Sequence, residues 1–262
     1  LVAGGIGATM NDLASAEVFD PRTNMWTILP PLPQSRYSQS ASLLADGRVL
    51  LVGGIVNHVI SRSTILFDPA RNVFISGPPT HFLHAQQCAV TLANGRILIA
   101  GGYGGQPETY DPASYSWKPA GSTPARIRPT MTLLPDGLVL LAGGTNRRDH
   151  DLSTASVFHP NTNRWTVTGP MHVPRNSGVA GVLSDGMVLV AGGEQVDDHL
   201  LKTAELYNPN VHSWGPAPPM KVARSGSTST ILLDGTLLVC GGSGFAGTLS
   251  SCEFFRPSGS RP

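Results

Sequence analysis

The sequence predicts an all-β protein built from six repeats of a four-stranded antiparallel sheet. Three observations predict this fold. A Gly-Gly pair closes an apolar run six times, at spacings of 49, 48, 42, 49 and 49 residues. The chain holds 30 Gly and 22 Pro, a content that favours many short elements joined by turns over long helices. The apolar runs between the turns are short enough to be strands.

Other residue types recur in step with the Gly-Gly pairs. An Asp-Gly or Asn-Gly precedes each later pair by seven residues, at Asp46, Asn94, Asp136, Asp185 and Asp234. An x-Pro follows each pair, at Pro21, Pro69, Pro112, Pro160, Pro209 and Pro257. Five residues beyond that proline lies Trp26, Phe74, Trp117, Trp165 or Trp214, and in the last unit Pro262. Ten residues before the Asp-Gly or Asn-Gly lies Arg36, His84, Arg126, Arg175 or Arg224. These aligned columns establish a true repeat.

The second unit illustrates the four strands of one repeat. Ser38–Leu44 alternates small polar and apolar residues, and Asp46-Gly47 predicts a two-residue type I′ hairpin turn. The apolar run Arg48–Val52 predicts a strand buried on both faces. Ser63–Phe67 is the expected third strand, and Val73–Ser76, after a proline-containing turn, is the fourth.

A single four-stranded sheet of this kind cannot bury both faces, whereas six sheets packed radially as the blades of a β-propeller can. We therefore expect one propeller domain over residues 1–262 with 22 strands, because the first unit lacks its first strand and the last lacks its fourth. The expected repeats cover residues 1–35, 36–83, 84–125, 126–174, 175–223 and 224–262. The chain opens at Leu1 within an apolar run, which indicates a fragment or a processed chain.

The Gly-Gly, the aromatic-Asp-Pro and the following Trp resemble the kelch repeat, whose period is about 50 residues. The runs Asp46–Gly54 and Ala16–Pro21 are similar to the form typical of bacterial kelch proteins and of the propeller of galactose-oxidase-like copper enzymes. The resemblance covers the whole chain and implies a kelch-type β-propeller of six blades.

Most repeated residues are interpreted as scaffold. The Gly-Gly pairs allow close backbone approach, and the aromatic column fills space between neighbouring blades. The basic column is expected to bond backbone carbonyls or a column of glutamates, Glu17, Glu108, Glu205 and Glu253. Cys240 and Cys252 stand at positions that pair between the second and third strands of the last blade, which predicts close contact and permits a disulfide.

Binding residues are expected on the loops after the Gly-Gly pairs and just after the basic column, since loops on a rigid frame carry recognition. In kelch proteins that bind peptides, residues of these two kinds line a shallow pocket. The candidates are Tyr37, His58, Tyr103, Arg147, Arg148, Asn176, Glu194 and Ser225. Two adjacent units also hold carboxylate and imidazole groups in equivalent loops, a pattern that could bind a divalent metal. These residues are Asp149, His150, Asp198 and His199.

The sequence favours a non-catalytic module that binds a protein or peptide, because it contains none of the common catalytic or phosphate-binding motifs. The alternative is a carbohydrate- or small-ligand-binding propeller, possibly a sugar-processing one, with Tyr103 as the stacking residue on a shortened loop. A galactose-oxidase-like copper enzyme is a weaker alternative. Tyr37 stands one residue out of register with that family's radical tyrosine, and Cys88 lies on the wrong neighbouring blade for its cross-linked cysteine. No cofactor is expected.

The overall composition limits which kinds of partner the sequence supports. The net charge is +1 and the basic residues do not cluster, which gives no case for nucleic acid. No apolar run is long enough to span a membrane. Only 13% of residues are charged, and together with the Ser, Thr, Gly and Pro content this leans toward a secreted protein. Incomplete blades would expose strand edges, through which the chain could form oligomers.

Overall fold

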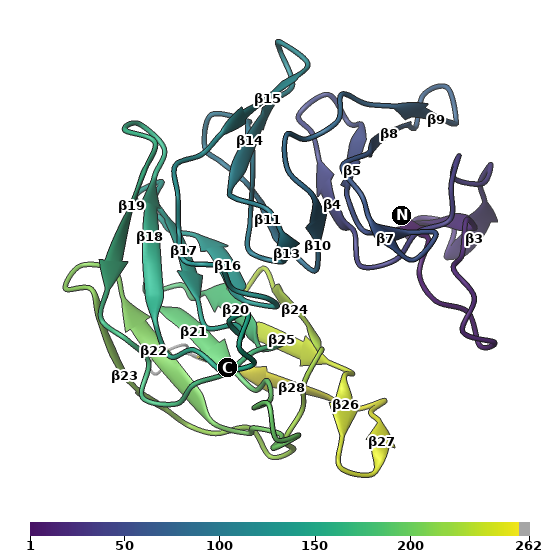
Figure 1. Cartoon of the computed structure of the whole chain (residues 1–262). Coiled ribbons are helices and arrows are strands. Elements are labelled where there is room, and N and C mark those ends of the chain that lie inside the picture. Colours follow the sequence, from purple (N-terminus) through teal and green to yellow (C-terminus); the bar gives the residue numbers. More distant parts are fainter. Residues whose placement is uncertain (257–262) are drawn as a thin grey trace. The chain divides into compact units, whose positions relative to one another are not determined.

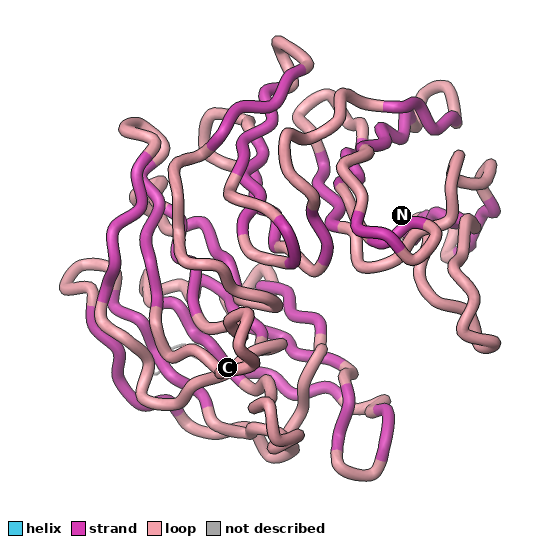
Figure 2. The backbone as a smooth tube through the Cα atoms, in the orientation of Figure 1, coloured by secondary structure: helices cyan, strands magenta, loops and turns pink. Residues whose placement is uncertain are grey.

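The fold is all-β in a computed structural model that describes residues 1–256. These residues form strands, turns and loops and no helix (Figure 2). Within them there is consequently no helix long and apolar enough to cross a membrane. The chain divides into two compact units, residues 1–120 and 121–262, which are described separately. The single domain expected over the whole chain stays a prediction.

The first unit contains three blade sheets (Figure 1). The first has three strands, β1 (Val2–Ala3), β2 (Ala16–Asp20) and β3 (Met25–Ile28). The second has β4 (Ser40–Leu43), β5 (Val49–Val52), β8 (Thr64–Asp68) and β9 (Val73–Ser76). The third has β11 (Cys88–Thr91), β12 (Ile97–Ala100), β14 (Glu108–Asp111) and β15 (Ser116–Pro119). Two short pairs accompany them, β6 (Ile55–Val56) with β7 (Val59–Ile60) and β10 (His84–Ala85) with β13 (Tyr103–Gly104).

The second unit contains the other three blade sheets, which run in chain order from teal to yellow in Figure 1. The fourth blade has β16 (Thr130–Leu133), β17 (Val139–Ala142), β18 (Ala155–His159) and β19 (Arg164–Thr168). The fifth has β20 (Val179–Val182), β21 (Val188–Ala191), β22 (Ala204–Asn208) and β23 (Ser213–Ala217). The sixth has β24 (Thr228–Ile231), β25 (Leu237–Cys240) and β28 (Cys252–Phe255), beside the short pair β26 (Ser243–Gly244) and β27 (Gly247–Thr248).

The six blades and their strands confirm the predicted fold class. Among the described residues, the first and last sheets have three strands and the four others have four, all antiparallel and in simple up-and-down order. Sequence reasoning did not predict the six short strands, five in the loops after Gly-Gly pairs and β10 at the basic column, because two-residue strands leave no periodic signal.

The predicted type I′ turn at Asp46-Gly47 is wrong. Gly47 has φ of +87°, but Asp46 is not among the residues with positive φ, which a type I′ turn would require. Leu44 N–H donates to Arg48 O and Gly47 N–H donates to Leu44 O, so the loop holds three residues and ends on a left-handed glycine. The Asp46 carboxylate accepts the Arg48 N–H at 3.1 Å, which explains why Asp or Asn precedes the glycine.

Within each unit, the second glycine of a Gly-Gly pair donates its N–H to the carbonyl of the basic-column residue of the next blade, at Gly5, Gly54, Gly144 and Gly193. In the fourth blade, Gly143 and Gly144 have φ of +67° and +90°, conformations that other residues rarely adopt. The Gly144 N–H donates to the Arg175 carbonyl of the fifth blade at 2.8 Å. A Cβ atom on Gly143 would collide with that same carbonyl. The close backbone approach predicted for this column is therefore confirmed.

Within each unit the core lies between successive blades and contains pairs of aromatic rings. An aromatic on the third strand faces the aromatic on the fourth, with ring centroids 4.9 to 5.2 Å apart in five blades. Tyr207 and Trp214 of the fifth blade pack with Leu140 and Val157 of the fourth in one buried cluster. The Trp214 indole N–H also donates to the Gly169 carbonyl at 2.8 Å. Trp117 and Trp214 thus fill the space between neighbouring blades, as predicted for this column, whereas Trp26 in the first blade is 53% exposed.

The basic column is buried and bonds the backbone of its own blade. Arg36, Arg126, Arg175 and Arg224 are each only 1% exposed. Every one of these guanidinium groups donates to the carbonyl of the first glycine of its Gly-Gly pair and to a second carbonyl just before the third strand. The scaffold role predicted for this column is confirmed.

A glutamate on the third strand accompanies the basic residue in blades where the connection from the preceding blade offers two backbone N–H groups. Glu205 accepts N–H bonds from His172 and Val173 and a side-chain bond from Arg175 at 3.1 Å. Glu108 and Glu253 are bound in the same way, with His84 in place of the arginine beside Glu108. In the second and fourth blades one of the two N–H positions is a proline, Pro33 or Pro124, and the glutamate is replaced by Ile65 or Ser156. A carboxylate is absent where the backbone cannot satisfy it.

A disulfide links the second and third strands of the sixth blade. Cys240 and Cys252 are directly paired residues, and their sulfur atoms are bonded. The bridge closes a loop of 12 residues, for which the loss of unfolded-state entropy corresponds to about 3 kcal/mol.

We expect a reducing agent to destabilise the sixth blade. Intact mass should rise by about two units per molecule on reduction, because each sulfur gains a hydrogen, and the melting temperature should fall. The double substitution Cys240→Ser and Cys252→Ser should melt at the same lower temperature with or without reductant. An unchanged mass on reduction would contradict the bridge.

Candidate binding rim

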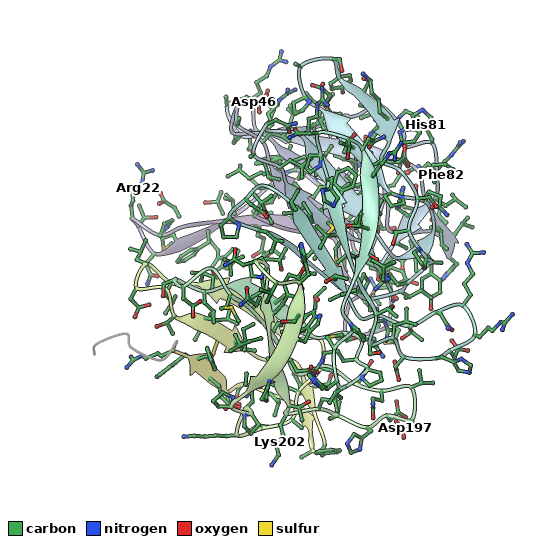
Figure 3. The ribbon with its side chains drawn as sticks, turned by 90° about the vertical axis from the view of Figure 1, so that its left-hand side faces the viewer. Arg22, Asp46, His81, Phe82, Asp197 and Lys202 are labelled. Atoms are coloured by element: carbon green, nitrogen blue, oxygen red, sulfur yellow. A yellow bond between two sulfur atoms is a disulfide. The ribbon has the colours of Figure 1, made fainter. Side chains whose placement is uncertain are left out.

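One end of each blade carries the loops after Gly-Gly and the connections into the next blade. The residue just after the basic column pairs with the residue just after the Gly-Gly of the same blade, as in the Asn176–Glu194 and Ser225–Ser243 bridges of the second unit. The bridge fixes both candidate positions on the frame of the blade. The opposite end carries only the short Asp-Gly and x-Pro turns, where Arg22 projects into solvent (Figure 3).

Six polar residues from three successive blades form a connected cluster at the loop-bearing end of the second unit. We call this set the rim cluster; its members are Arg128, Asp151, Asn176, Ser177, Glu194 and Ser225. The Glu194 carboxylate lies at its centre. It accepts hydrogen bonds from Arg128 at 3.2 Å, from the Ser177 hydroxyl at 3.4 Å and from the Ser225 hydroxyl at 2.8 Å. The fourth, fifth and sixth blades therefore all converge on one carboxylate.

Asp151 connects the fourth blade to the loop of the fifth. One of its oxygens accepts the Asn176 side-chain N–H at 2.8 Å and the Thr145 hydroxyl at 3.3 Å. The other accepts the Val196 backbone N–H at 2.5 Å. Asn176 is buried and also donates to the Glu194 carbonyl, so the loop that carries Glu194 is held on both sides. The rim cluster is thereby preorganised by the frame.

Two members of the rim cluster have left-handed backbone conformations. Arg128 and Ser177, each two residues after the basic column, have φ of +52° and +53°. The equivalent residues of the other blades are also left-handed, namely Ser38, Gln86 and Gly226. The Ser177 N–H donates to the Arg128 carbonyl, and the Gly226 N–H donates to the Ser177 carbonyl. Strain of this kind persists only where surrounding structure enforces it, and it gathers at functional positions.

Sequence reasoning named three members of the rim cluster and missed the others. Asn176, Glu194 and Ser225 were predicted as binding residues, whereas Asp151, Arg128 and Ser177 were not. Arg128 and Ser177 were missed because a positive φ is not expected of arginine or serine. The missing signal was positional, since both residues stand at one fixed distance after the basic column.

The remaining predicted binding residues lie outside this cluster. In the first unit Tyr37 is half-buried and bridges Ile55, His58 is exposed at the β6–β7 turn, and Tyr103 on β13 is 42% exposed. In the second unit Arg147 and Arg148 are exposed in the loop after β17. These side chains stay candidates for ligand contact.

The four predicted metal ligands are not brought together. Asp149, His150, Asp198 and His199 are all exposed on loop tips. Across residues 1–256 no group of three or more His, Cys, Asp or Glu side chains is placed to hold a metal ion. Two residues were considered as parts of a copper centre. Cys88 lies on β11, and Tyr37 bridges Ile55 of the β6–β7 pair.

Comparison with known proteins agrees with the repeat architecture. The family described as Kelch motif matches residues 1–33. The F-box/kelch-repeat protein At1g67480 of Arabidopsis thaliana is 38% identical over 65 residues, which is 25% of this chain and 17% of that protein. The solved structure of YjhT superposes with a TM-score of 0.78 at 15% identity, covering 98% of this chain and 92% of the other. At that identity the structural match shows a shared fold over almost the whole chain.

Proposed function

We propose that this β-propeller, whose repeats are similar to kelch repeats, is a non-catalytic module that recognises a protein or peptide through the loop-bearing end of its blades. The observation that carries the proposal is the rim cluster. Its carboxylate, amide, hydroxyl and guanidinium groups form a fixed polar surface of the kind that hydrogen-bonds an extended backbone and its polar side chains.

The scaffold columns support this proposal because they are the same in most blades, whereas the loops at the rim differ between blades. The basic, glutamate, Gly-Gly and aromatic columns are each occupied by contacts within and between blades. The loops after the Gly-Gly pairs differ in sequence and length from blade to blade, from residues 103–107 before β14 in the third to residues 194–203 before β22 in the fifth. Recognition concentrates on such loops when a rigid scaffold presents them.

Selection of a displayed random-peptide library against the chain tests the proposal. We expect Glu194→Ala to weaken the selected peptides by about tenfold or more, since it removes the acceptor shared by three rim side chains, a change of about 1.4 kcal/mol in binding free energy. Asp185→Asn is the matched control at the opposite end, because Asn94 already performs the turn role of Asp185 in the third blade.

Two outcomes would contradict the proposal. Peptides that bind the wild type and Glu194→Ala equally would place recognition elsewhere. Binding to glycans instead of peptides, abolished by Tyr103→Ala and indifferent to Glu194→Ala, would favour the carbohydrate-binding alternative, in which the exposed Tyr103 ring stacks on a sugar.

A further inference from the structure

The buried glutamate of the third blade differs from that of the fifth in the cations around it. Glu108 on β14 and Glu205 on β22 stand at the same repeat position, and their side chains are 0% and 4% exposed. Glu205 lies 3.1 Å from Arg175, whose guanidinium is always charged. In the third blade His84 stands in place of that arginine, and within residues 1–256 both ion pairs of Glu108 are with histidines.

Four groups donate to the Glu108 carboxylate, and two of them are imidazole rings. One oxygen binds the His81 N–H at 3.0 Å and the His81 Nδ1 at 2.6 Å. The other binds the Phe82 N–H at 3.1 Å and the His84 Nε2 at 3.0 Å. His81 and Phe82 lie side by side in the connection before β10 (Figure 3).

These bonds keep the carboxylate charged at neutral pH. Burial alone would raise the pKa of Glu108, but hydrogen bonds from the two rings and from the backbone hold that pKa below its ordinary value. A buried carboxylate is costly unless a cation balances it. Among the four donors only an imidazolium can supply that charge, whereas Arg175 supplies it to Glu205 at every pH.

The two rings differ in how well they can hold a second proton. His84 is 0% exposed, and its Nδ1 is buried with no hydrogen-bond partner in the part of the chain that the structure describes. A proton on that atom would be an unsatisfied buried donor. The His81 side chain is 53% exposed, so an imidazolium there keeps part of its hydration. Histidine is the side chain that ordinarily changes charge between about pH 5 and 8. We therefore expect His81 to carry the balancing charge.

The elements packed around these three residues bring no other cation into contact with the carboxylate. Arg62 before β8, Tyr103 on β13 and Lys118 on β15 form no hydrogen bond or ion pair with it in residues 1–256. In the second blade, Arg36 binds carbonyls of its own blade. On β11, burial raises the pKa of Cys88 to about 12, so that thiol is neutral. The charge balance is therefore decided by the two histidines.

The loop of residues 103–107 packs directly on the His84 ring. His84 pairs with Gly104, and Ala85 pairs with Tyr103, in the β10–β13 pair. A Cβ atom on Gly105 would lie 2.5 Å from His84 Cε1. Gly105 is not among the residues with positive φ, so glycine is required there by space and not by backbone conformation. Any loss of the bond between His84 and its carboxylate is therefore transmitted to this loop.

We propose that Glu108, His81 and His84 make the third blade sensitive to pH, so that the loop of residues 103–107 is held closed while the three residues share a bound proton and opens more often once that proton is lost. The folded blade binds this proton beside a carboxylate, and the unfolded chain binds it without one. Because the folded state then holds more protons, its stability is present below neutral pH and falls as pH rises. The three groups titrate as a unit. The device is separate from the rim cluster and does not depend on the function proposed there.

Hydrogen exchange of the full chain at about pH 6 and about pH 8, corrected for the intrinsic exchange rate at each pH, tests the proposal. Protection of residues 101–110 should fall about tenfold over this range, since one bound proton changes an equilibrium by at most about tenfold per pH unit. The equivalent residues 192–207 of the fifth blade are the internal control. Their protection should change less than about threefold, because Arg175 balances Glu205 at both pH values.

Two variants replace the titrating charge with a permanent one. His81→Lys copies Lys221, which stands at the same repeat position beside Glu253, and should keep at pH 8 the protection seen at pH 6. His84→Arg restores the arginine of the basic column and should also remove the pH dependence. It provides a second test from the buried side of the carboxylate. His172→Lys, the matched change in the fifth blade, should leave protection unchanged at both pH values.

Three results would overturn the proposal. Protection of residues 101–110 could be equal at the two pH values, or it could fall at pH 8 to the same extent in wild type and His81→Lys. An equal fall in the third and fifth blades would assign the effect to the whole protein and not to these three residues.

Discussion

Replacing Arg175 with methionine is expected to lower the free energy of unfolding by about 3 kcal/mol, because the substitution leaves a buried carboxylate without its cation. Arg175 is 1% exposed and lies 3.1 Å from Glu205, whose side chain is 4% exposed. The arginine also donates to the Gly192 and Thr203 carbonyls, which would lose a buried donor. Urea unfolding of the second unit, residues 121–262, followed within the full chain, measures the change.

Arg126 is the matched control for this effect. It is equally buried and binds the same two kinds of carbonyl, but its blade has Ser156 at the repeat position that Glu205 occupies in the blade of Arg175. Burial lowers the pKa of Arg126 to about 10, which shows the cost of a desolvated charge that no carboxylate offsets. Arg126→Met should therefore cost less than Arg175→Met. Equal losses would mean that the carbonyl contacts, and not the ion pair, stabilise this column.

The pH dependence of the Arg175 variant gives an independent readout. Burial alone would raise the pKa of Glu205, but hydrogen bonds from His172, Val173 and Arg175 together hold that pKa below its ordinary value. Stability from this group is present above the unfolded pKa of about 4.3 and is lost as pH falls through the lower folded pKa. Without Arg175 the folded pKa rises, so the difference in stability from the wild type should shrink as both proteins approach the pH at which Glu205 is protonated.

The sequence predicted the blades well because each one is specified locally. Val73–Ser76 was predicted with its observed bounds, and Ser63–Phe67 is observed one residue later, at Thr64–Asp68. Turn residues and apolar runs at a fixed spacing are enough for this. The turn type at Asp46-Gly47 was missed because Asp-Gly serves both two-residue and three-residue loops, and only the backbone bonds distinguish them.

The rim cluster could not be predicted as a unit because its contacts join residues far apart in the chain. Ser225 meets Glu194 across 31 residues, and Arg128 meets Glu194 across 66. The repeat columns show which positions are equivalent. They do not show that side chains from three blades contact the Glu194 carboxylate. Only the packing of successive blades brings these groups within hydrogen-bonding distance.

Gly193→Ala is expected to destabilise the second unit by about 3 kcal/mol, since two separate costs combine. Gly193 has φ of +94°, which costs an L-residue about 1 kcal/mol or more. The added Cβ would also collide with the Asn176 carbonyl, which cannot move freely because it accepts the Glu194 N–H. Overpacking against such a fixed group costs about 1 to 3 kcal/mol.

Gly186→Ala separates these two costs. Gly186 has φ of +82° at the Asp-Gly turn, and its nearest neighbour to an added Cβ is Pro135 at 3.9 Å, an ordinary contact. The substitution should therefore cost only the conformational part, about 1 kcal/mol. Because Gly193 also lies beside Asn176 of the rim cluster, Gly193→Ala should weaken rim-bound peptides, whereas Gly186→Ala should not. Equal stabilities for the two variants would show that only the positive φ requires glycine in the Gly-Gly column. The close approach between blades would then add no cost of its own.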